Sequence, residues 1–583
     1  MNAWPRKLRR VEALHIALVS LCLASSAFAA KKPAGPPPAI SGIFPDGGKV
    51  GSTFSCKVDG TLTKSATKAW ADHDGIVFKP TKKPDTFEVT IAPEVPLGPH
   101  LVRFFNDDGA SPPRIFVVGN YEEANDTEPN DDFRKPQVLP KLPVTVNGRM
   151  EKAGDVDVFA VKVEAGHWLV CDLQGYALGS PMDPAMKVLD ERGVELAGSH
   201  DTHNLDPFIA YEVKKTGTYL VEVMAFAHPP AADVTLKGAA THIYRLTLTD
   251  QPYAKVAWPC AVQRGTQSKP KLLGWNFGPK MEGPELTVDT TPFAASDEII
   301  RLLTPHGEPV LASVVNSPIV MEVEPNNTFA QAQRVTLPCT LAGRIDAPKD
   351  EDRFIFSAKK GENLEFRVRS FALHSPMDAW VRVEDKQGKT LAQADDEKEG
   401  SFDPLLKWKA PADGDYVLAI GDLFSRGGWE YVYAIEAGTA PQRIAATLDA
   451  SAYKLEAGKT VEVKLTTKLS GEFKGKLLVH TDGLPPGVTA KEPDLTPKGG
   501  DLKLTLTATA EAAPSNQPFG VTITTSAPDA PQTFKASFDI PVTEPRGDRL
   551  MNEDIRAWLT VIGKAAEVEK PATPPAPAAG EKK

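Results

Sequence analysis

Glu128-Pro129-Asn130-Asp131 recurs almost two hundred residues later as Glu324-Pro325-Asn326-Asn327. The segments that follow these stretches stay nearly in register, and Ser180-Pro-Met-Asp183 returns unchanged as Ser375-Pro-Met-Asp378. Self-similarity over such a distance indicates a duplicated structural unit rather than a chance tetrapeptide. We therefore expect two repeats of one fold, and we look first at what they preserve.

The residues that recur most faithfully carry carboxylates, amides and turn-forming side chains. Calcium takes six to eight oxygen ligands, and alternate side chains of an extended stretch point the same way. Pro129 keeps Glu128 extended. A second acidic pair follows in each repeat at a predicted turn, so two donor clusters could close one cage around a structural Ca²⁺ ion. The candidate ligands are Asp126, Glu128, Asn130, Asp131, Asp155 and Asp157 in the first repeat, and Glu322, Glu324, Asn326, Asn327, Asp350 and Asp352 in the second.

An alternative stays open, because Asp, Asn and Pro form turns whatever else they do. On that interpretation the acidic stretches are solvated turns. For the further recurring acids, of which Asp206 and Asp403 form one pair, turn capping is the favoured interpretation.

The order Glu-Pro-Asn-Asp, Gly-Arg, Asp-x-Asp-x-Phe, Asp-Pro and Gly-x-Tyr resembles the bacterial pre-peptidase C-terminal domain, which is related to clostridial collagen-binding domains. The resemblance implies a jelly-roll β-sandwich, and in calcium-binding members of the family the same acidic stretches are ligands. This chain departs from the family pattern at two positions. Asp126 is shorter than the family's first Glu, and Asn327 removes a charge.

The rest of the chain reads as short strands between Gly, Pro and Asp turns. Proline supplies 52 of 583 residues, near twice the usual ~5 %, which favours strands and turns over long helices. The stretch that begins at Ile40 resembles the IPT/TIG immunoglobulin-like modules of bacterial surface proteins. We expect an all-β chain, a string of β-sandwich domains: 1–29 signal peptide, 38–120 IPT/TIG-like, 125–250 first pre-peptidase-like sandwich, 251–320 degenerate immunoglobulin-like, 321–437 second pre-peptidase-like sandwich, 441–564 immunoglobulin-like, and 565–583 disordered tail.

The first residues predict export. A basic start, an apolar run from Leu14 to Ala24 and Ala27-Phe28-Ala29 are typical of a secretory signal peptide, and no later stretch is long enough to span a membrane. The net charge of −10 argues against nucleic acid and anionic bilayers as partners. We expect a secreted, periplasmic or cell-surface protein. Its four later cysteines have no paired spacing, which favours unpaired thiols: Cys56, Cys171, Cys260 and Cys339.

No catalytic motif is present: there is no His-Glu-x-x-His and no Gly-x-Ser-x-Gly. The pair His200 and His203 has no counterpart in the second repeat, and Arg546-Gly-Asp548 reads as an ordinary turn. We expect a non-catalytic protein that adheres to an extracellular protein or polysaccharide. The alternative is an accessory or targeting protein of secreted peptidases, and a third hypothesis, direct hydrolysis, needs a recurring acid/base pair that the sequence does not show.

Overall fold

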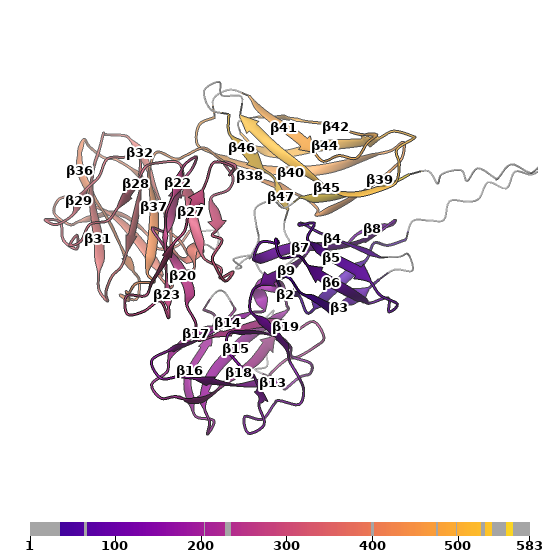
Figure 1. Cartoon of the computed structure of the whole chain (residues 1–583). Helices are drawn as coiled ribbons and strands as arrows, with labels where there is room; N and C mark the ends of the chain where they lie inside the picture. The colour runs from indigo at the N-terminus through magenta and orange to yellow at the C-terminus, as the bar shows by residue number, and fades with distance from the viewer. Residues whose placement is uncertain are drawn as a thin grey trace, which may run out of the picture. The chain divides into compact units, whose positions relative to one another are not determined.

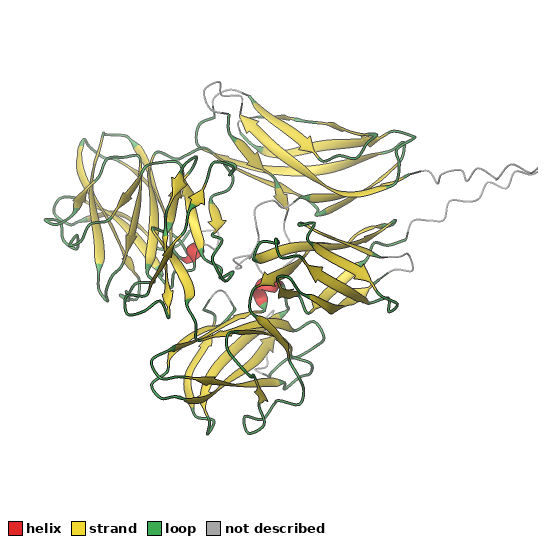
Figure 2. Cartoon of the chain, in the orientation of Figure 1, coloured by secondary structure: helices red, strands yellow, loops and turns green. Residues whose placement is uncertain are grey.

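A computed structural model describes residues 35–62, 67–202, 205–227, 235–397, 402–473, 476–496, 498–525, 531–538 and 556–563. These residues form strands, loops and two single-turn 3-10 helices, which confirms the predicted all-β class and the string of β-sandwich domains (Figures 1 and 2). No helix in the described part of the chain is long and apolar enough to cross a membrane. The expected signal peptide, the C-terminal tail, His203 and Arg546-Gly-Asp548 lie outside the described residues.

The first sandwich pairs two sheets around Phe87, Phe104 and Phe116. Strand β6 alternates as the sequence predicts, with Phe87, Val89 and Ile91 buried. Strand β7 (Gly98–Asn106) is buried on both faces, and the guanidinium of Arg103 donates to the Ser111 carbonyl at 3.1 Å. One sheet has the order β1 (Ala39–Phe44), β3 (Thr53–Thr61), β6 (Thr86–Ile91), β5 (Ile76–Pro80). The other has the order β2 (Gly47–Lys49), β9 (Arg114–Gly119), β7 (Gly98–Asn106), β4 (Lys68–Ala71), with β8 (Gly109–Ala110) beside β7.

The first repeat is a sandwich of two five-stranded sheets with its apolar core between them. One sheet has the order β10 (Glu122–Asn125), β12 (Val144–Arg149), β19 (Ile243–Thr249), β14 (Trp168–Gln174), β17 (Phe208–Glu212). The other has the order β11 (Gln137–Val138), β13 (Val156–Val163), β18 (Gly217–Ala227), β15 (Met182–Asp190), β16 (Glu195–His200), and the helix η1 spans Tyr176–Leu178.

The second repeat has the same strand order in both sheets. One sheet runs β28 (Ile319–Met321), β30 (Cys339–Arg344), β37 (Val432–Gly438), β32 (Asn363–Arg369), β35 (Leu405–Lys409). The other runs β29 (Gln333–Arg334), β31 (Glu351–Ala358), β36 (Gly414–Asp422), β33 (Ala379–Glu384), β34 (Thr390–Ala394), and η2 spans Phe371–Leu373. The sequence repeat is therefore matched by one repeated strand topology.

Residues 253–315 form smaller sheets. Their orders are β20 (Tyr253–Trp258), β23 (Lys271–Trp275), β24 (Glu282–Glu285); β21 (Ala261–Gln263), β27 (Leu311–Val315), β26 (Ile299–Arg301); and β22 (Gln267–Ser268), β25 (Val288–Asp289). Strand β21 pairs in parallel with β27, as β2 pairs in parallel with β9 in the first sandwich. The two regions therefore share a parallel strand pair at matching places.

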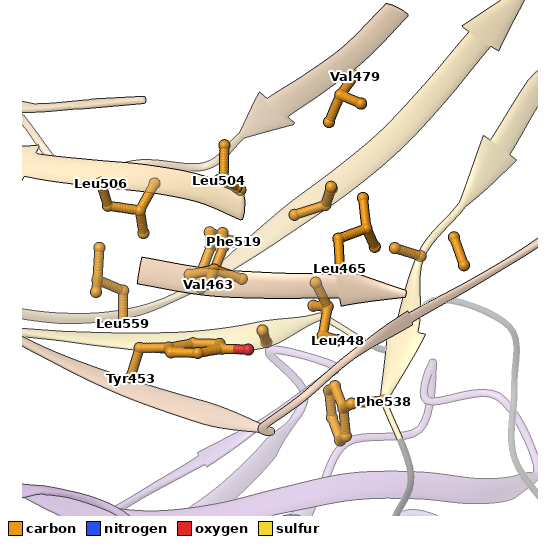
Figure 3. Packing of buried hydrophobic residues seen from close by; sticks show 14 of the residues in the cluster. Leu448, Tyr453, Val463, Leu465, Val479, Leu504, Leu506, Phe519, Phe538 and Leu559 are labelled. Carbon is orange, nitrogen blue, oxygen red and sulfur yellow. The ribbon is translucent and has the colours of Figure 1, made fainter. Parts of the chain in front are cut away.

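The last sandwich alternates cleanly. Val463 and Leu465 of β40 are buried while Lys464 between them is exposed, and Figure 3 shows both apolar side chains in the core with Phe519 and Leu559. The described residues 556–563 supply the strand β48 (Ala557–Ile562). One sheet has the order β42 (Val488–Lys491), β44 (Gly500–Ala508), β40 (Thr460–Ser470), β38 (Arg443–Leu448), β47 (Ser537–Phe538). The other has the order β39 (Ala452–Glu456), β48 (Ala557–Ile562), β45 (Ser515–Thr525), β41 (Leu477–Asp482), β43 (Asp494–Leu495), with β46 (Thr533–Lys535) beside β45.

The four cysteines behave as small apolar core residues, which confirms the prediction of unpaired thiols. All four are free and buried: Cys56, Cys171, Cys260 and Cys339.

Candidate metal centres

Each repeat brings two sheet-to-sheet connections to the same end of its sandwich. Strand β10 pairs in parallel with β12, and β11 pairs in parallel with β13. The chain therefore crosses in the same direction twice, from the first sheet to the second, between β10 and β11 and again between β12 and β13. It returns to the first sheet between β11 and β12. The first crossing carries the Glu-Pro-Asn motif and the second carries the acidic pair. The same pairings, β28 with β30 and β29 with β31, recur in the second repeat.

In the first repeat, the structure gathers the predicted carboxylates into two overlapping groups. Carboxylate oxygens of Asp126, Glu128 and Asp157 all lie within 4.8 Å of one another, and so do those of Glu128, Asp131 and Asp155. Glu128 belongs to both groups. The Asn130 amide donates to Asp126 Oδ1 at 2.8 Å, which leaves its own oxygen turned toward no protein donor.

In the second repeat, one such group forms from Glu322, Glu324 and Asp352, whose oxygens lie within 4.8 Å of one another. Asp350 is held by the Asp346 backbone N–H at 2.9 Å and keeps its second oxygen buried without a hydrogen bond. Asn326 is fully buried beside this group, with neither side-chain polar atom hydrogen-bonded. Asn327 is exposed, and only its backbone carbonyl accepts, from Arg353.

A buried tyrosine holds the deepest carboxylate of each centre. Tyr244 donates to Asp157 Oδ2 at 2.5 Å, and Tyr433 donates to Asp352 Oδ2 at 2.6 Å with Glu322 Oε2 3.1 Å away. The sequence analysis missed both tyrosines, although they occupy matching places in the last strand of each repeat.

The recurring Gly-Arg pair has its explanation in the same tyrosines. A Cβ on Gly148 would lie 2.0 Å from Tyr244 Cζ, and one on Gly343 would lie 2.1 Å from the Tyr433 hydroxyl. Only glycine lets the ring cross the strand at this point. The recurrence of this glycine was therefore the available signal for the tyrosine.

Oxygen atoms without partners converge in both centres. Buried side-chain polar groups in proteins are nearly always hydrogen-bonded, so such atoms call for an explanation. In the described residues, the buried oxygens of the predicted ligands that accept no hydrogen bond and face no lysine are Glu128 Oε1, Asn130 Oδ1, Asp157 Oδ1, Asn326 Oδ1, Asp350 Oδ1 and Asp352 Oδ1. Each carboxylate among them accepts a hydrogen bond at its other oxygen, which leaves one buried oxygen without a protein donor.

Burial and mutual repulsion make these carboxylates poor anions in the absence of a cation. Burial, and then the charge of Asp126, raise the pKa of Asp157 to about 9. Burial, and then the charge of Glu322, raise the pKa of Asp352 to about 10. Burial is also the main cause that raises the pKa of Asp126 to about 6 and that of Glu322 to about 7. A divalent cation would relieve both causes at once.

The two centres differ at one edge. Lys152 Nζ lies 3.3 Å from Asp155 Oδ1 and 3.4 Å from Asp131 Oδ2, so an ammonium group already contacts the second group of the first repeat. The second repeat has Asn327 and Ala347 at the positions of Asp131 and Lys152. The second repeat therefore lacks both the acid at the position of Asp131 and the lysine at the position of Lys152.

The recurring Asp206 and Asp403 cap turns, as the sequence predicts. Asp206 accepts backbone N–H bonds at 2.7 to 3.0 Å from Gly175, Tyr176 and Ala177 at the start of η1. Asp403 accepts three at the same place in the second repeat.

His200 is exposed, and its Nδ1 lies 3.2 Å from a carboxylate oxygen of the neighbouring Asp201. It takes no part in either carboxylate group.

No family model matches the chain, and no curated protein matches it. Among solved structures, the pre-peptidase C-terminal domain of collagenase from Bacillus anthracis is similar at 14% identity, with 20% of this chain and 99% of that chain covered and a TM-score of 0.16. Trypsin-activated alpha-2-macroglobulin from Escherichia coli is similar at 11% identity over 88% of this chain and 48% of that chain, with a TM-score of 0.15. Domains 1–6 of the surface layer protein SbsC are similar at 9% identity over 87% of this chain and 55% of that one, with a TM-score of 0.13. The chain thus spans about half of the macroglobulin and surface-layer chains, and these likenesses identify no function.

Proposed function

We propose that the two centres bind Ca²⁺ and that this multidomain β-rich chain is an exported, non-catalytic protein that adheres to an extracellular protein or glycan. The observation that carries the calcium assignment is the convergence of buried, unpartnered oxygens in both repeats. An ion at each centre would join the two connections that run between the sheets at this end of the sandwich. Because such an ion binds the folded state, it would stabilise each repeat by mass action.

The donor chemistry favours calcium over other divalent metals. The groups offer carboxylate and amide oxygens and contain no histidine or cysteine. Zinc and copper prefer nitrogen or sulfur ligands, and magnesium usually retains several waters rather than binding in an all-protein cage. Calcium accepts irregular sets of six to eight oxygens, which suits ligands from two connecting segments.

The two repeats should differ in stoichiometry. The shared Glu128 allows two ions in the first repeat once calcium displaces the Lys152 ammonium from Asp131 and Asp155, whereas the second repeat has one carboxylate group, so we expect three calcium ions per chain. Asp131→Asn, which introduces the residue found at position 327, should remove one ion by depriving the second group of an acid. Isothermal titration calorimetry of the whole mature chain measures this number. A variant that still binds three ions, or a wild-type chain that binds none, would contradict the assignment.

Stability without calcium should fall as the pH rises. Asp157 and Asp352 have folded-state pKa values of about 9 and about 10, against about 3.9 in an unfolded chain. Between these limits the folded state binds more protons than the unfolded state, so the free energy of unfolding decreases with pH. In chelator, the melting temperature should therefore drop from pH 5 to pH 9. Saturating calcium should make the melting temperature depend less on pH, because the bound ion replaces the protons on these carboxylates. A chelated chain whose stability rises across this range would contradict the charge assignment.

The adhesion part of the proposal rests on the sequence resemblance of the two repeats to pre-peptidase C-terminal and collagen-binding domains. The sequence begins with the pattern of an export signal, the net charge is −10, and the described residues are built into sandwiches with a repeated centre. We assign no catalytic group. Turnover of a polymer that one carboxylate substitution abolishes would contradict this part of the proposal.

A further inference from the structure

The same outer face of the sandwich carries apolar side chains in the first repeat and charged side chains at the matching positions of the second. This outer face is the side of the sheet β11-β13-β18-β15-β16, or β29-β31-β36-β33-β34, that points away from the core. In the first repeat it carries a small apolar cluster, against which Phe133 packs, made of Val158, Ala160, Leu189 and Leu220. In the second repeat Arg353 and Glu384 replace Val158 and Leu189, and Phe329, the counterpart of Phe133, is 39% exposed.

A hollow of about 250 Å³ lies on the outer face of the second repeat, lined by Trp380, Arg382, Gln393, Ala394, Asp395 and Leu423. Trp380 of β33 stands opposite Gly421 of β36, and its indole occupies the space that a Cβ on Gly421 would need, with Cζ2 only 2.5 Å away. Arg382 lies over the same ring, 3.9 Å from its centroid. The tryptophan is therefore held rigidly at the surface.

The first repeat has a different residue pair at this place. At the matching register it pairs Ala185 with Met224, where the second repeat pairs Trp380 with Gly421. The exchange of both partners of one cross-strand pair is what creates the indole wall.

The charges of the hollow disfavour an anionic ligand. Arg382 is paired with Glu351 at 3.2 Å and with Glu384 at 3.1 Å, so its positive charge is already balanced. Asp395 adds a carboxylate to the lining. A phosphate, sulfate or uronate would therefore meet a neutral to negative surface.

We propose that this hollow binds one neutral sugar unit of a glycan. This inference rests on the proposed adhesive function and names its ligand class. The part of the indole that lines the hollow, together with Leu423, offers an apolar surface to the C–H groups of a sugar ring, while amide, carboxylate and guanidinium groups hydrogen-bond pairs of hydroxyls. The volume is below the ~300–1,000 Å³ of sites for drug-sized ligands, which suits a single ring. Leu423, 50% exposed, extends the apolar wall at the rim.

The test is isothermal titration calorimetry of the whole mature chain in calcium with neutral oligosaccharides. The probes are hexamers of β1,4- and β1,3-linked glucose, β1,4-linked mannose, xylose and N-acetylglucosamine, with a polygalacturonate oligomer as the anionic comparison. We expect at least one neutral hexamer to bind and the anionic oligomer not to bind. The double variant Trp380→Ala/Gly421→Met should weaken that binding at least tenfold. It should fold normally, because it reproduces the Ala185 and Met224 pair of the first repeat. Phe424→Ala, at an exposed aromatic beside the hollow, is the matched control and should leave the affinity unchanged.

Three results would overturn the inference: no binding by any neutral hexamer at millimolar concentration, binding that the double variant leaves intact, or binding of the anionic oligomer alone. The calcium response of the same samples separates this inference from the proposed function. A double variant that keeps its calcium-induced stabilisation while the sugar test fails would refute the sugar site only. Attachment to a protein surface through the hollow would likewise replace the sugar with a peptide ligand and refute this proposal.

Discussion

Calcium should raise the temperature at which the repeats unfold, and the double variant Asp157→Asn/Asp352→Asn should lose most of that rise. At a calcium concentration about a hundredfold above Kd, one bound ion stabilises its repeat by about 3 kcal/mol, enough for a shift on the order of 10 °C in a unit of this size. Asparagine keeps the shape of the buried acid but removes the charge that holds the ion. Differential scanning calorimetry in calcium and in chelator measures the shift.

The choice of asparagine keeps this prediction separate from a failure to fold. The raised pKa values of Asp157 and Asp352 mean that both are protonated at neutral pH when no metal is bound. A neutral amide should therefore be tolerated, and the variant should melt in chelator close to the wild-type chain. Asp132→Asn is the matched control, because this acid adjoins the first centre but caps Arg134 N–H at 3.0 Å outside the carboxylate groups. A double variant that keeps the full calcium shift would refute the two centres.

Asp403→Ala should destabilise the second repeat by about 4 kcal/mol. The carboxylate accepts three backbone N–H bonds, from Ser370, Phe371 and Ala372, at 2.8 to 3.0 Å. Hydrogen bonds to a charged acceptor contribute roughly 1.5–3 kcal/mol each, and removal of the acceptor strands buried donors. The loss exceeds that of an ordinary surface substitution because one side chain serves three amides. Urea unfolding of the whole chain, followed by the fluorescence of its tryptophans, measures the change.

Two further variants, Asp403→Asn and Asp396→Ala, are the comparisons for the loss of stability expected in Asp403→Ala. The asparagine retains Oδ1, which serves Ser370 and Phe371, so it should lose less than the alanine variant. Asp396 is an exposed recurring acid, and its replacement should change stability by no more than about 0.5 kcal/mol. Equal effects for Asp403→Ala and Asp396→Ala would show that the three-amide cap contributes nothing.

Much of the fold and most of the candidate site could be predicted from local patterns. The alternation of β6 and β40 follows from apolar residues at every second position, and the Glu-Pro-Asn motif and acidic pair lie where the chain crosses between sheets. These features depend on residues close together in sequence. The sequence alone could not show that β7 is buried on both faces, because the burial of a strand's second face depends on tertiary packing and not on its local pattern.

The missed features depend on cross-strand register. Tyr244 reaches Asp157 because β19 lies beside β12 with Tyr244 opposite Gly148, a pairing that no spacing in the sequence reveals. The pair of Trp380 and Gly421 is hidden in the same way, because each residue alone is ordinary for a strand and only their register makes a surface hollow. Patterns in the sequence therefore did not predict contacts between residues that face each other across neighbouring strands.

The most direct measurement is a crystal structure of the mature chain grown in calcium, with anomalous difference maps to locate the ions. The account predicts anomalous peaks within 2.3–2.6 Å of carboxylate oxygens of Glu128 and Asp157 in the first repeat and of Glu324 and Asp352 in the second. Asn130 and Asn326 should turn their amide oxygens to these peaks. Maps without a peak at either group, at calcium concentrations far above those of the extracellular medium, would contradict the claim that these centres bind calcium.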